Sequence, residues 1–440
     1  MRGRQHGLLQ GCATAGRPDI LRAVRISFRT FGCRLNQAET AAFERAFAAA
    51  GWQVAPFGEP ADVAVIHGCA VTRPAELECL RLARGLKRRA AGRGDPAPWV
   101  VLVGCVVEAG GGPVPGVDLL VARKDKARLP EILARLAGQT SPDRPTGRPP
   151  PVRRVRALLK VQDGCDFFCS YCIVPHLRGP PVSRPWQVVL DEARTLAAAG
   201  ATELVVTGCN LARYRDGTRG LADLVAAICA LDEVGRVRLG SIEPATGERE
   251  IVDLMGACPK LCRHLHLPLQ SGDAAVLRAM GRRYTPESFA ATVCDAAGRV
   301  PGLGLGTDAI VGFPDETEAA FGNTRRLLAA LPFGNLHVFP YSERPGTRAA
   351  ELPGRVAPAV RKARAASLLA LREAKRQSFA LEFVGREVDV LVERADRHGG
   401  RGWTGAYVEC RVAGGRQEDV GRILRVRPES AENGVLQAAK

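Results

Sequence analysis

The sequence predicts an α/β protein with parallel sheets, followed by a small C-terminal β-barrel. Strand and helix patterns alternate over residues 24–136, and they alternate again from Val155 to about Tyr341. Such alternation is typical of parallel sheets whose strands are joined by helices. A stretch dense in proline and glycine at residues 138–151 separates the two runs and predicts an extended linker. A chain of 440 residues is long enough for two or three domains.

The first predicted domain covers residues 24–136. Its expected strands and helices, in order, are Arg25–Thr30, Asn36–Ala50 (helix), Asp62–His67, Arg73–Ala91 (helix) and Trp99–Gly104. Residues 1–23 are basic and glycine-rich and lack the apolar core of a secretory signal, so we expect a disordered extension there.

The second predicted domain covers residues 153–376, after a linker at 137–152. Its expected strands are Ala157–Gln162, Glu203–Thr207, Arg236–Ser241, Arg263–Leu267, Leu305–Val311 and Leu336–Phe339. Helical segments separate them, and six such units predict a full or partial (βα)6 barrel resembling a TIM barrel. In barrels the chemistry takes place at the carboxyl ends of the strands, and Gln162 runs directly into a loop of cysteines.

The C-terminal part begins with a long, arginine-rich helical stretch at Ala357–Phe383. Three short strands are expected after it, at Gly385–Glu393, Thr404–Val412 and Asp419–Arg427. Short strands of this kind are typical of small β-barrel modules. We therefore place a third domain at residues 377–440.

Composition limits the possible partners and compartments. The net charge of +16 suits a polyanionic partner, since each neutralised phosphate releases counterions, although a merely basic protein from a GC-rich genome would also show it. No apolar run approaches the ~20 residues of a membrane span. Fourteen cysteines without a secretion signal indicate reduced thiols in the cytoplasm, some of them metal ligands.

Three cysteines lie close together in the barrel, at Cys165, Cys169 and Cys172. Most [4Fe–4S] clusters are held by four cysteines. The C-x3-C-x2-C spacing provides three thiolates on one short loop, which is enough to hold three irons of such a cluster. The fourth iron would then be open to a small molecule, so this loop predicts a reactive cluster.

A second set of cysteines follows three strands of the first domain. Cys33, Cys69 and Cys105 each follow a glycine at a predicted strand end, and they are 36 residues apart. Parallel strands bring such ends to one edge of the sheet, so we expect the thiols to converge on a second iron–sulfur cluster with an open iron. The alternatives are three buried structural cysteines, or a zinc site completed by His67.

The barrel loop, including Tyr171, resembles the signature of radical S-adenosylmethionine (SAM) enzymes, and several further motifs are similar to those of the methylthiotransferase family, most closely its MtaB-type branch. These motifs are Thr30–Glu39, Val65–Thr72, Val103–Cys105, Tyr171–Pro175, Ser241–Pro244, His266–Gly272, Met280–Tyr284, Thr307–Thr317, Phe339–Ser342 and Arg344–Thr347. The C-terminal piece is similar to a TRAM domain, a small RNA-binding barrel. His67-Gly68 stands where the family usually has Asn-Thr, Cys209 replaces a usual valine, and Val182 replaces a common arginine.

The resemblance implies two [4Fe–4S] clusters and SAM as cofactors. The cluster on Cys165, Cys169 and Cys172 would bind SAM and cleave it to a radical after one-electron reduction. The cluster on Cys33, Cys69 and Cys105 would hold the inserted sulfur, and a second SAM would give the methyl group. The implied SAM-pocket residues are Tyr171, Gly208, Glu243, Gln270, Gly312 and Pro314. Gly312 and Pro314 have a simpler explanation as turn residues, and Glu243 as a surface carboxylate.

The MtaB-type branch implies methylthiolation of C2 of N6-threonylcarbamoyladenosine at position 37 of tRNA. The expected partners are the anticodon stem-loop and a one-electron reductant such as flavodoxin or ferredoxin, with no membrane, for a cytoplasmic monomer. Lys87–Arg89, Arg153–Arg154 and Arg361–Arg376 are candidate RNA contacts. The alternative substrates are isopentenyladenosine in tRNA and a ribosomal protein side chain; a non-catalytic RNA-binding metalloprotein is an alternative of another class.

Overall fold

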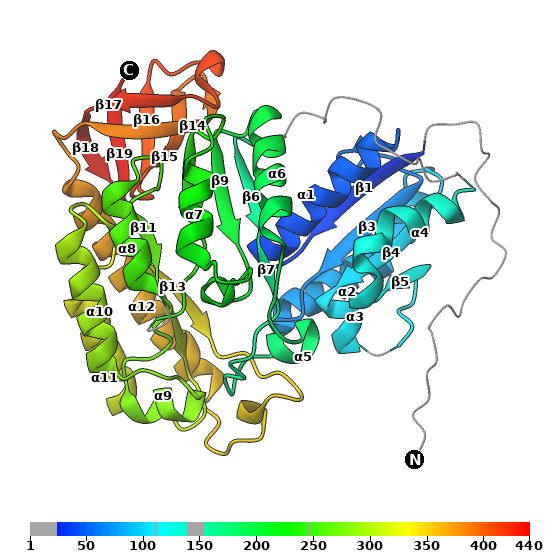
Figure 1. Cartoon of the computed structure of the whole chain (residues 1–440). Helices are drawn as coiled ribbons and strands as arrows, with labels where there is room; N and C mark the ends of the chain where they lie inside the picture. Colours follow the sequence, from blue (N-terminus) through cyan, green and yellow to red (C-terminus); the bar gives the residue numbers. More distant parts are fainter. Residues whose placement is uncertain (1–23, 111, 139–153, 245–246) are drawn as a thin grey trace. The chain divides into compact units, whose positions relative to one another are not determined.

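A computed structural model describes residues 24–110, 112–138, 154–244 and 247–440 of the chain (Figure 1). The expected extension at 1–23 and almost all of the expected linker lie outside these residues. The chain divides into two compact units, residues 1–150 and 151–440. Each unit is described by itself.

The N-terminal unit is a five-stranded parallel sheet in the order β2-β1-β3-β4-β5. The strands are β1 (Arg25–Thr30), β2 (Gln53–Ala55), β3 (Val63–Gly68), β4 (Trp99–Gly104) and β5 (Leu119–Val121). The helical segments are α1 (Arg34–Ala49), α2 (Arg73–Ala91), α3 (Cys105–Gly110), the 3-10 helix η1 (Arg123–Arg128) and α4 (Leu129–Leu136). The three predicted strands are present, and the short strands β2 and β5 extend the sheet at both sides. The helix expected from Asn36 begins two residues earlier, directly after Cys33.

The second unit contains a partial barrel of six parallel strands in chain order. The strands are β6 (Arg156–Lys160), β9 (Glu203–Thr207), β10 (Arg236–Leu239), β11 (His264–His266), β12 (Gly304–Val311) and β13 (Asn335–Pro340). Single bridges, Val237 to Leu261 and Ser241 to His266, join its two three-stranded halves. The predicted (βα)6 barrel is therefore confirmed as a partial one.

Helices cover the outer face of the barrel strands. They are α6 (Trp186–Ala198), α7 (Leu221–Cys229), α8 (Glu248–Ala257), α10 (Pro286–Arg299), α11 (Glu318–Ala330) and α12 (Pro358–Leu381), while the shorter α5 (Val174–Arg178) and α9 (Ala274–Met280) flank the cysteine loop. Strand residues such as Leu204 and Leu305 pack into the apolar core shared with the outer helices. Alternate strand residues point the other way, so the inner face carries polar side chains such as Glu203, Arg238 and Asp308.

The C-terminal sheet is curled and has six strands in the order β17-β14-β15-β16-β19-β18 (Figure 1). They are β14 (Val388–Asp396), β15 (Gly399–Thr404), β16 (Glu409–Ala413), β17 (Ile423–Val426), β18 (Pro428–Glu432) and β19 (Val435–Ala439). The single strand expected at Thr404–Val412 is wrong, because the backbone turns at Tyr407, which has φ +65°. The last two strands, and β15 apart from Thr404, were not predicted.

Candidate functional site

The barrel cysteine loop, residues 164–173, lies between the short strand β7 (Gln162–Asp163) and α5. Gly164 opens it in the left-handed region, with φ +75°, and a Cβ there would lie 2.0 Å from the carbonyl oxygen of Pro180. Only glycine fits this position. The Cys165 amide donates to the Gly179 carbonyl (3.0 Å), which ties the beginning of the loop to the end of α5.

The middle of the loop is fixed by Ser170, which is buried. Its amide donates to the Met280 carbonyl (2.9 Å), its hydroxyl donates to the Ala279 carbonyl (2.8 Å), and its own carbonyl accepts from the Ala349 amide (2.8 Å). Ser170 separates Cys169 from Tyr171 and Cys172. The cysteine spacing is therefore held by backbone contacts to two distant segments of the barrel.

The thiols of this loop suit a metal cluster. Burial, together with the neighbouring thiolates of Cys169 and Cys165, raises the pKa of Cys172 to about 12. Burial also raises the pKa of Cys165. Both thiols are therefore protonated at neutral pH in the absence of metal, and metal binding would release these protons. Three soft donors on one loop fit an iron–sulfur cluster with one open iron.

A buried arginine lies against this loop. One terminal nitrogen of Arg282, Nη1, lies 3.3 Å from Cys169 Sγ and 3.4 Å from the Tyr171 hydroxyl. Its other terminal nitrogen is ion-paired with Glu243. Glu243 is therefore not a surface carboxylate, since its side chain is only 13% exposed. The Met280–Tyr284 motif contains Arg282, but its sequence alone predicted no role for this side chain.

The predicted SAM-pocket residues beyond the loop follow the carboxyl ends of four neighbouring strands. Gly208 follows β9, Glu243 follows β10, Gln270 follows β11, and Gly312 and Pro314 follow β12. They therefore belong to the same edge of the barrel as the cysteine loop. Gln270 adopts φ +68°, unusual outside glycine, and its backbone pairs with β12.

Gly312 also has a packing reason to be glycine. Its φ is +74°, and a Cβ there would lie 2.2 Å from Cγ of Arg361. Its amide donates to the Glu316 carboxylate (2.6 Å), which closes the turn after β12. These contacts explain the residue as part of a turn, whether or not a ligand approaches it.

The three cysteines of the N-terminal unit, the edge cysteines Cys33, Cys69 and Cys105, follow β1, β3 and β4, which are neighbours in the sheet. A Cβ on Gly32, which has φ +92°, would lie 2.4 Å from Cβ of Cys69, so the loops carrying Cys33 and Cys69 touch. A Cβ on Gly104 (φ +100°) would lie 2.6 Å from the Gly68 carbonyl. The glycine before each cysteine therefore allows the strand ends to approach closely.

Asn36 and His67 are buried polar residues close to the loops of the edge cysteines. Fully buried Asn36 donates through Nδ2 to the carbonyls of Phe31 (3.0 Å) and Gly68 (3.2 Å), which bridges two cysteine loops. The ring nitrogens of His67 contact the Thr40 hydroxyl (2.9 Å) and the Glu39 carboxylate (3.3 Å). Because His67 is buried and its ring nitrogens face these two side chains, the structure does not favour His67 as a zinc ligand.

The inner face of the barrel carries a cluster that sequence reasoning missed. One carboxylate oxygen of Asp308 lies 2.9 Å from His266 Nε2 and 3.1 Å from His337 Nδ1, and the two rings stack 5.0 Å apart. Burial alone would raise the pKa of Asp308, but the two imidazoles hold it well below its usual range. These three residues come from the neighbouring strands β11, β12 and β13 and form a polar cluster inside the barrel.

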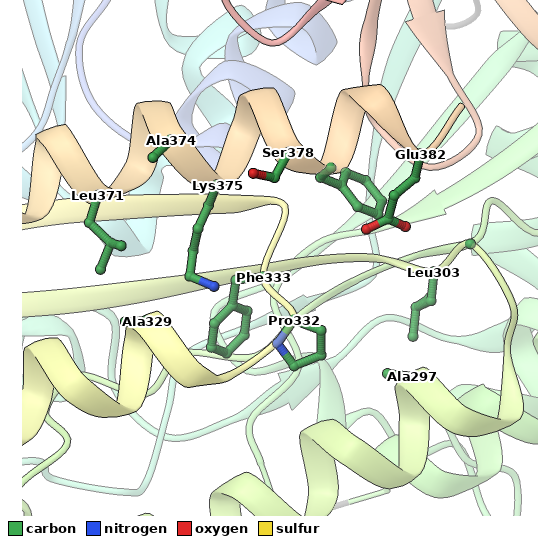
Figure 2. A pocket seen from close by; sticks show the side chains of 12 residues that line it. Ala297, Leu303, Ala329, Pro332, Phe333, Leu371, Ala374, Lys375, Ser378 and Glu382 are labelled. Atoms are coloured by element: carbon green, nitrogen blue, oxygen red, sulfur yellow. The ribbon is translucent and has the colours of Figure 1, made fainter. Parts of the chain in front are cut away.

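A separate hollow of about 370 Å³ lies on the outside of the barrel. Helices α10, α11 and α12 line it, and Figure 2 shows Lys375 pointing from α12 into it. The Lys375 amine donates to the Leu331 carbonyl (2.6 Å). None of the predicted site residues lines this hollow, so it is not the candidate active site.

Within the described residues, no helix is long and apolar enough to cross a membrane.

A loop of three cysteines at the carboxyl edge of a partial (βα)6 barrel is the arrangement of radical SAM enzymes, and residues 159–328 match the model of the Radical SAM superfamily. Residues 25–114 match a family described as uncharacterized protein family UPF0004. The threonylcarbamoyladenosine tRNA methylthiotransferase MtaB of Bacillus subtilis is 31% identical over 91% of this chain and 93% of its own length. The chain therefore belongs to the radical SAM methylthiotransferase family, and the resemblance seen in its motifs is confirmed.

Two further proteins place the chain within the family and the fold. A tRNA-2-methylthio-N(6)-dimethylallyladenosine synthase of Cereibacter sphaeroides is 34% identical over 85% of this chain and 88% of its own length. The solved structure of the radical SAM methyltransferase TsrM from Kitasatospora setae has a TM-score of 0.56 and 16% identity, covering 75% of this chain and 74% of its own. The second likeness shows the fold alone.

Membership of the family establishes the class of reaction. The protein is an enzyme that transfers sulfur and a methyl group, using [4Fe–4S] chemistry and SAM. When bound, SAM would supply the radical needed to remove an unactivated hydrogen, a step beyond the reach of protein acids and bases. A non-catalytic binding role is thereby excluded.

Proposed function

We propose that this enzyme methylthiolates C2 of N6-threonylcarbamoyladenosine at position 37 of tRNA, next to the anticodon. The methylthiolation part of this proposal is carried by two separate sets of three cysteines, each at the carboxyl edge of a parallel sheet. The motif after Phe31-Gly32 and the similarity to MtaB proteins support this substrate.

We assign one cluster to each set of cysteines. Cys165, Cys169 and Cys172 would hold the cluster that binds SAM, because their loop lies among the strand ends that carry the predicted pocket. The edge cysteines would hold the second cluster, which carries the sulfur. Tyr171, Glu243 and Gln270 would then contact or orient SAM, along with Gly208, Gly312 and Pro314.

The basic surface proposed for tRNA includes one face of α2. Arg81, Arg84 and Arg88 are exposed and follow the i, i+3, i+7 spacing of one helix face, with exposed Arg89 beside them. Phosphate contacts from such a stripe would bind RNA without reading its sequence.

The arginine-rich helix α12 supports RNA binding less than the sequence predicted. Arg361 donates to the carbonyls of Val356 (2.8 Å) and Tyr341 (3.0 Å). Arg364 is buried and ion-paired with Glu316 (2.7 Å). These side chains hold α12 against the barrel. Of the other predicted runs, Arg153 lies outside the described residues.

The remaining assignments follow from the family and stay proposals. We take residues 24–136 as the methylthiotransferase domain, 153–376 as the radical SAM domain and 377–440 as an RNA-binding TRAM-like domain. A flavodoxin or ferredoxin would give the electron, and the enzyme would act in the cytoplasm as a monomer.

The test is nucleoside analysis of tRNA by mass spectrometry from a strain that lacks this gene. Methylthio-threonylcarbamoyladenosine should disappear and return when the intact gene is restored. Restoring a gene with Cys33, Cys69 and Cys105 changed to alanine should not return it, although the protein should still cleave SAM. Unchanged methylthio-threonylcarbamoyladenosine in the deletion strain would overturn the proposal.

A second candidate substrate is isopentenyladenosine in tRNA. The 34% identity to the Cereibacter sphaeroides synthase, slightly above that to the MtaB proteins, favours it. The same digest separates the two substrates, because only the methylthio derivative of the true substrate would be lost.

A further inference from the structure

Arg282 follows α9 within the Met280–Tyr284 motif, and its side chain is only 4% exposed. Besides Cys169, Tyr171 and Glu243, it has a fourth partner: Nε donates to the Tyr284 hydroxyl (2.9 Å). All three nitrogens of the guanidinium are thus engaged inside the protein. An arginine buried to this extent is rare unless its charge is paired.

The guanidinium is held rigidly. The Tyr284 hydroxyl, which accepts from Arg282, lies 2.7 Å from the Pro268 carbonyl oxygen and 2.8 Å from that of Leu269, so its own proton is directed to the end of β11. The Arg282 guanidinium also lies over the Tyr284 ring, 5.0 Å from its centre. Such fixed partners position a charge to within a fraction of an ångström.

The charge is permanent and poorly screened. Arginine keeps its proton in proteins, and this side chain is only 4% exposed. Glu243 is paired with it and is also largely buried, with a side chain 13% exposed. A cation therefore stands beside Cys169 Sγ, with one carboxylate on its far side.

Hydrogen bonds to the sulfur ligands and the local net charge set the reduction potential of an iron–sulfur cluster. A fixed cation beside a ligand sulfur stabilises the form of the cluster that carries one more negative charge, and low local dielectric strengthens the effect. In radical SAM chemistry this reduced form is the one that must be reached before SAM is cleaved.

We propose that Arg282 is a positioning residue that raises the reduction potential of the cluster on Cys165, Cys169 and Cys172, with Glu243 acting in the opposite direction. The inference rests on the proposed assignment of this cluster. The step is the gain of one electron by the oxidised cluster from a low-potential external donor. No covalent bond in the protein forms or breaks in it.

The neighbouring Arg283 provides a matched control. It belongs to the same loop and carries the same charge, but its guanidinium stacks on the Phe167 ring, 4.4 Å from its centre. Arg283→Gln removes one positive charge from this loop without removing the contact to Cys169. A difference between the two variants therefore reports the contact, not the overall charge.

The experiment is a redox titration monitored by electron paramagnetic resonance on the full chain without SAM. Cys33, Cys69 and Cys105 are changed to alanine in every sample, so that only the barrel cluster is observed. Arg282→Gln should lower the equilibrium constant for one-electron reduction at least tenfold, a shift of about 59 mV to lower potential. Arg282→Lys should keep most of the potential, and Arg283→Gln should leave it within threefold.

A loaded Arg282→Gln cluster with the parent potential would overturn the inference, as would equal shifts in both arginine variants. If Arg282→Gln fails to load iron, the reduction potential of the Glu243→Gln variant is measured instead. Removing this opposing charge should shift the potential of the barrel cluster upward. No shift, or a downward one, would overturn the inference. Failure of the parent to bind about four irons would instead contradict the cluster assignment in the proposed function.

Discussion

Arg238 Nε lies 2.9 Å from the carboxylate of Glu203 inside the barrel, and neither side chain is more than 1% exposed. A second arginine, Arg236, is ion-paired with the same carboxylate. Both guanidinium groups also donate to the C-terminal sheet, Arg236 to the Trp403 carbonyl (3.0 Å) and Arg238 to the Thr404 carbonyl (3.0 Å). The Glu203 carboxylate on β9 thus holds two arginines that connect the barrel to this sheet.

Tyr407, from the C-terminal sheet region, packs against the same arginine and against the barrel. Its ring centre lies 4.5 Å from the guanidinium of Arg238 and 5.6 Å from that of Arg156, and it packs against His264 on β11. Buried charges with several fixed partners hold one arrangement and resist sliding. These contacts therefore hold the C-terminal sheet firmly against the barrel.

Glu203→Gln should destabilise the second unit by about 3–5 kcal/mol, because two buried arginines lose their charge partner. Urea unfolding measures this change. Burial alone would raise the pKa of Glu203, but Arg238 and Arg236 hold it below its ordinary value. The carboxylate therefore contributes stability above its unfolded pKa of about 4.3. That stability is lost as the pH falls through the lower folded pKa. The free energy of unfolding of the Glu203→Gln variant should not show this decrease.

An exposed pair gives the control for this prediction. Arg194 and Asp191 form an ion pair of 3.0 Å on α6, with side chains 44% and 61% exposed. Asp191→Asn should cost less than about 1 kcal/mol. Similar costs for the two variants would show that burial does not determine the strength of the Glu203 cluster.

The placement of the edge cysteines after three neighbouring parallel strands was predictable because its signal is local. A glycine and a cysteine follow each apolar strand in the sequence, and such strands can be recognised one by one. The barrel was predictable for the same reason, since each strand and helix could be read on its own.

The contacts that fix the site were not predictable, because they join residues far apart in the chain. Arg282 reaches Cys169 across 113 positions, and Arg238 reaches Thr404 across 166. In the C-terminal sheet, no strand was predicted over most of β15, which contains Gly402. A Cβ there would lie 1.9 Å from the Leu391 carbonyl oxygen, so glycine is required inside this strand.

Asn36→Ala should weaken the edge-cysteine site selectively. The change leaves the buried carbonyls of Phe31 and Gly68 without the donor that bridges them, at a cost of about 1–3 kcal/mol. Iron after anaerobic reconstitution should fall from about eight toward about four per chain, while SAM cleavage persists. Gln187→Ala, on the exposed face of α6, should keep the parent iron content. Loss of SAM cleavage together with the iron would contradict a local role for Asn36.

Gly164→Ala should abolish the barrel cluster, and Gly217→Ala should not. Both glycines have positive φ, +75° and +60°, so alanine costs about 1–2 kcal/mol of backbone strain at either position. Only at Gly164 does the new Cβ meet backbone, 2.0 Å from the Pro180 carbonyl oxygen, whereas nothing lies within 4 Å at Gly217. The expected result is about four irons and no SAM cleavage for the first variant. Equal loss in both would mean that strain alone, without the collision, explains the defect.

The arginine stripe of α2 provides the test of the proposed RNA surface. Changing Arg84 and Arg88 together to glutamate should weaken tRNA binding at every salt concentration and reduce the slope of log affinity against log salt by about 2. Arg325 and Arg326, exposed on α11, supply a control with the same change of charge. Filter binding of tRNA from 50 to 200 mM salt measures both. If the α11 variant loses as much affinity as the α2 variant, overall charge accounts for binding and α2 makes no specific contact; if only the α2 variant changes, the phosphates lie along this helix.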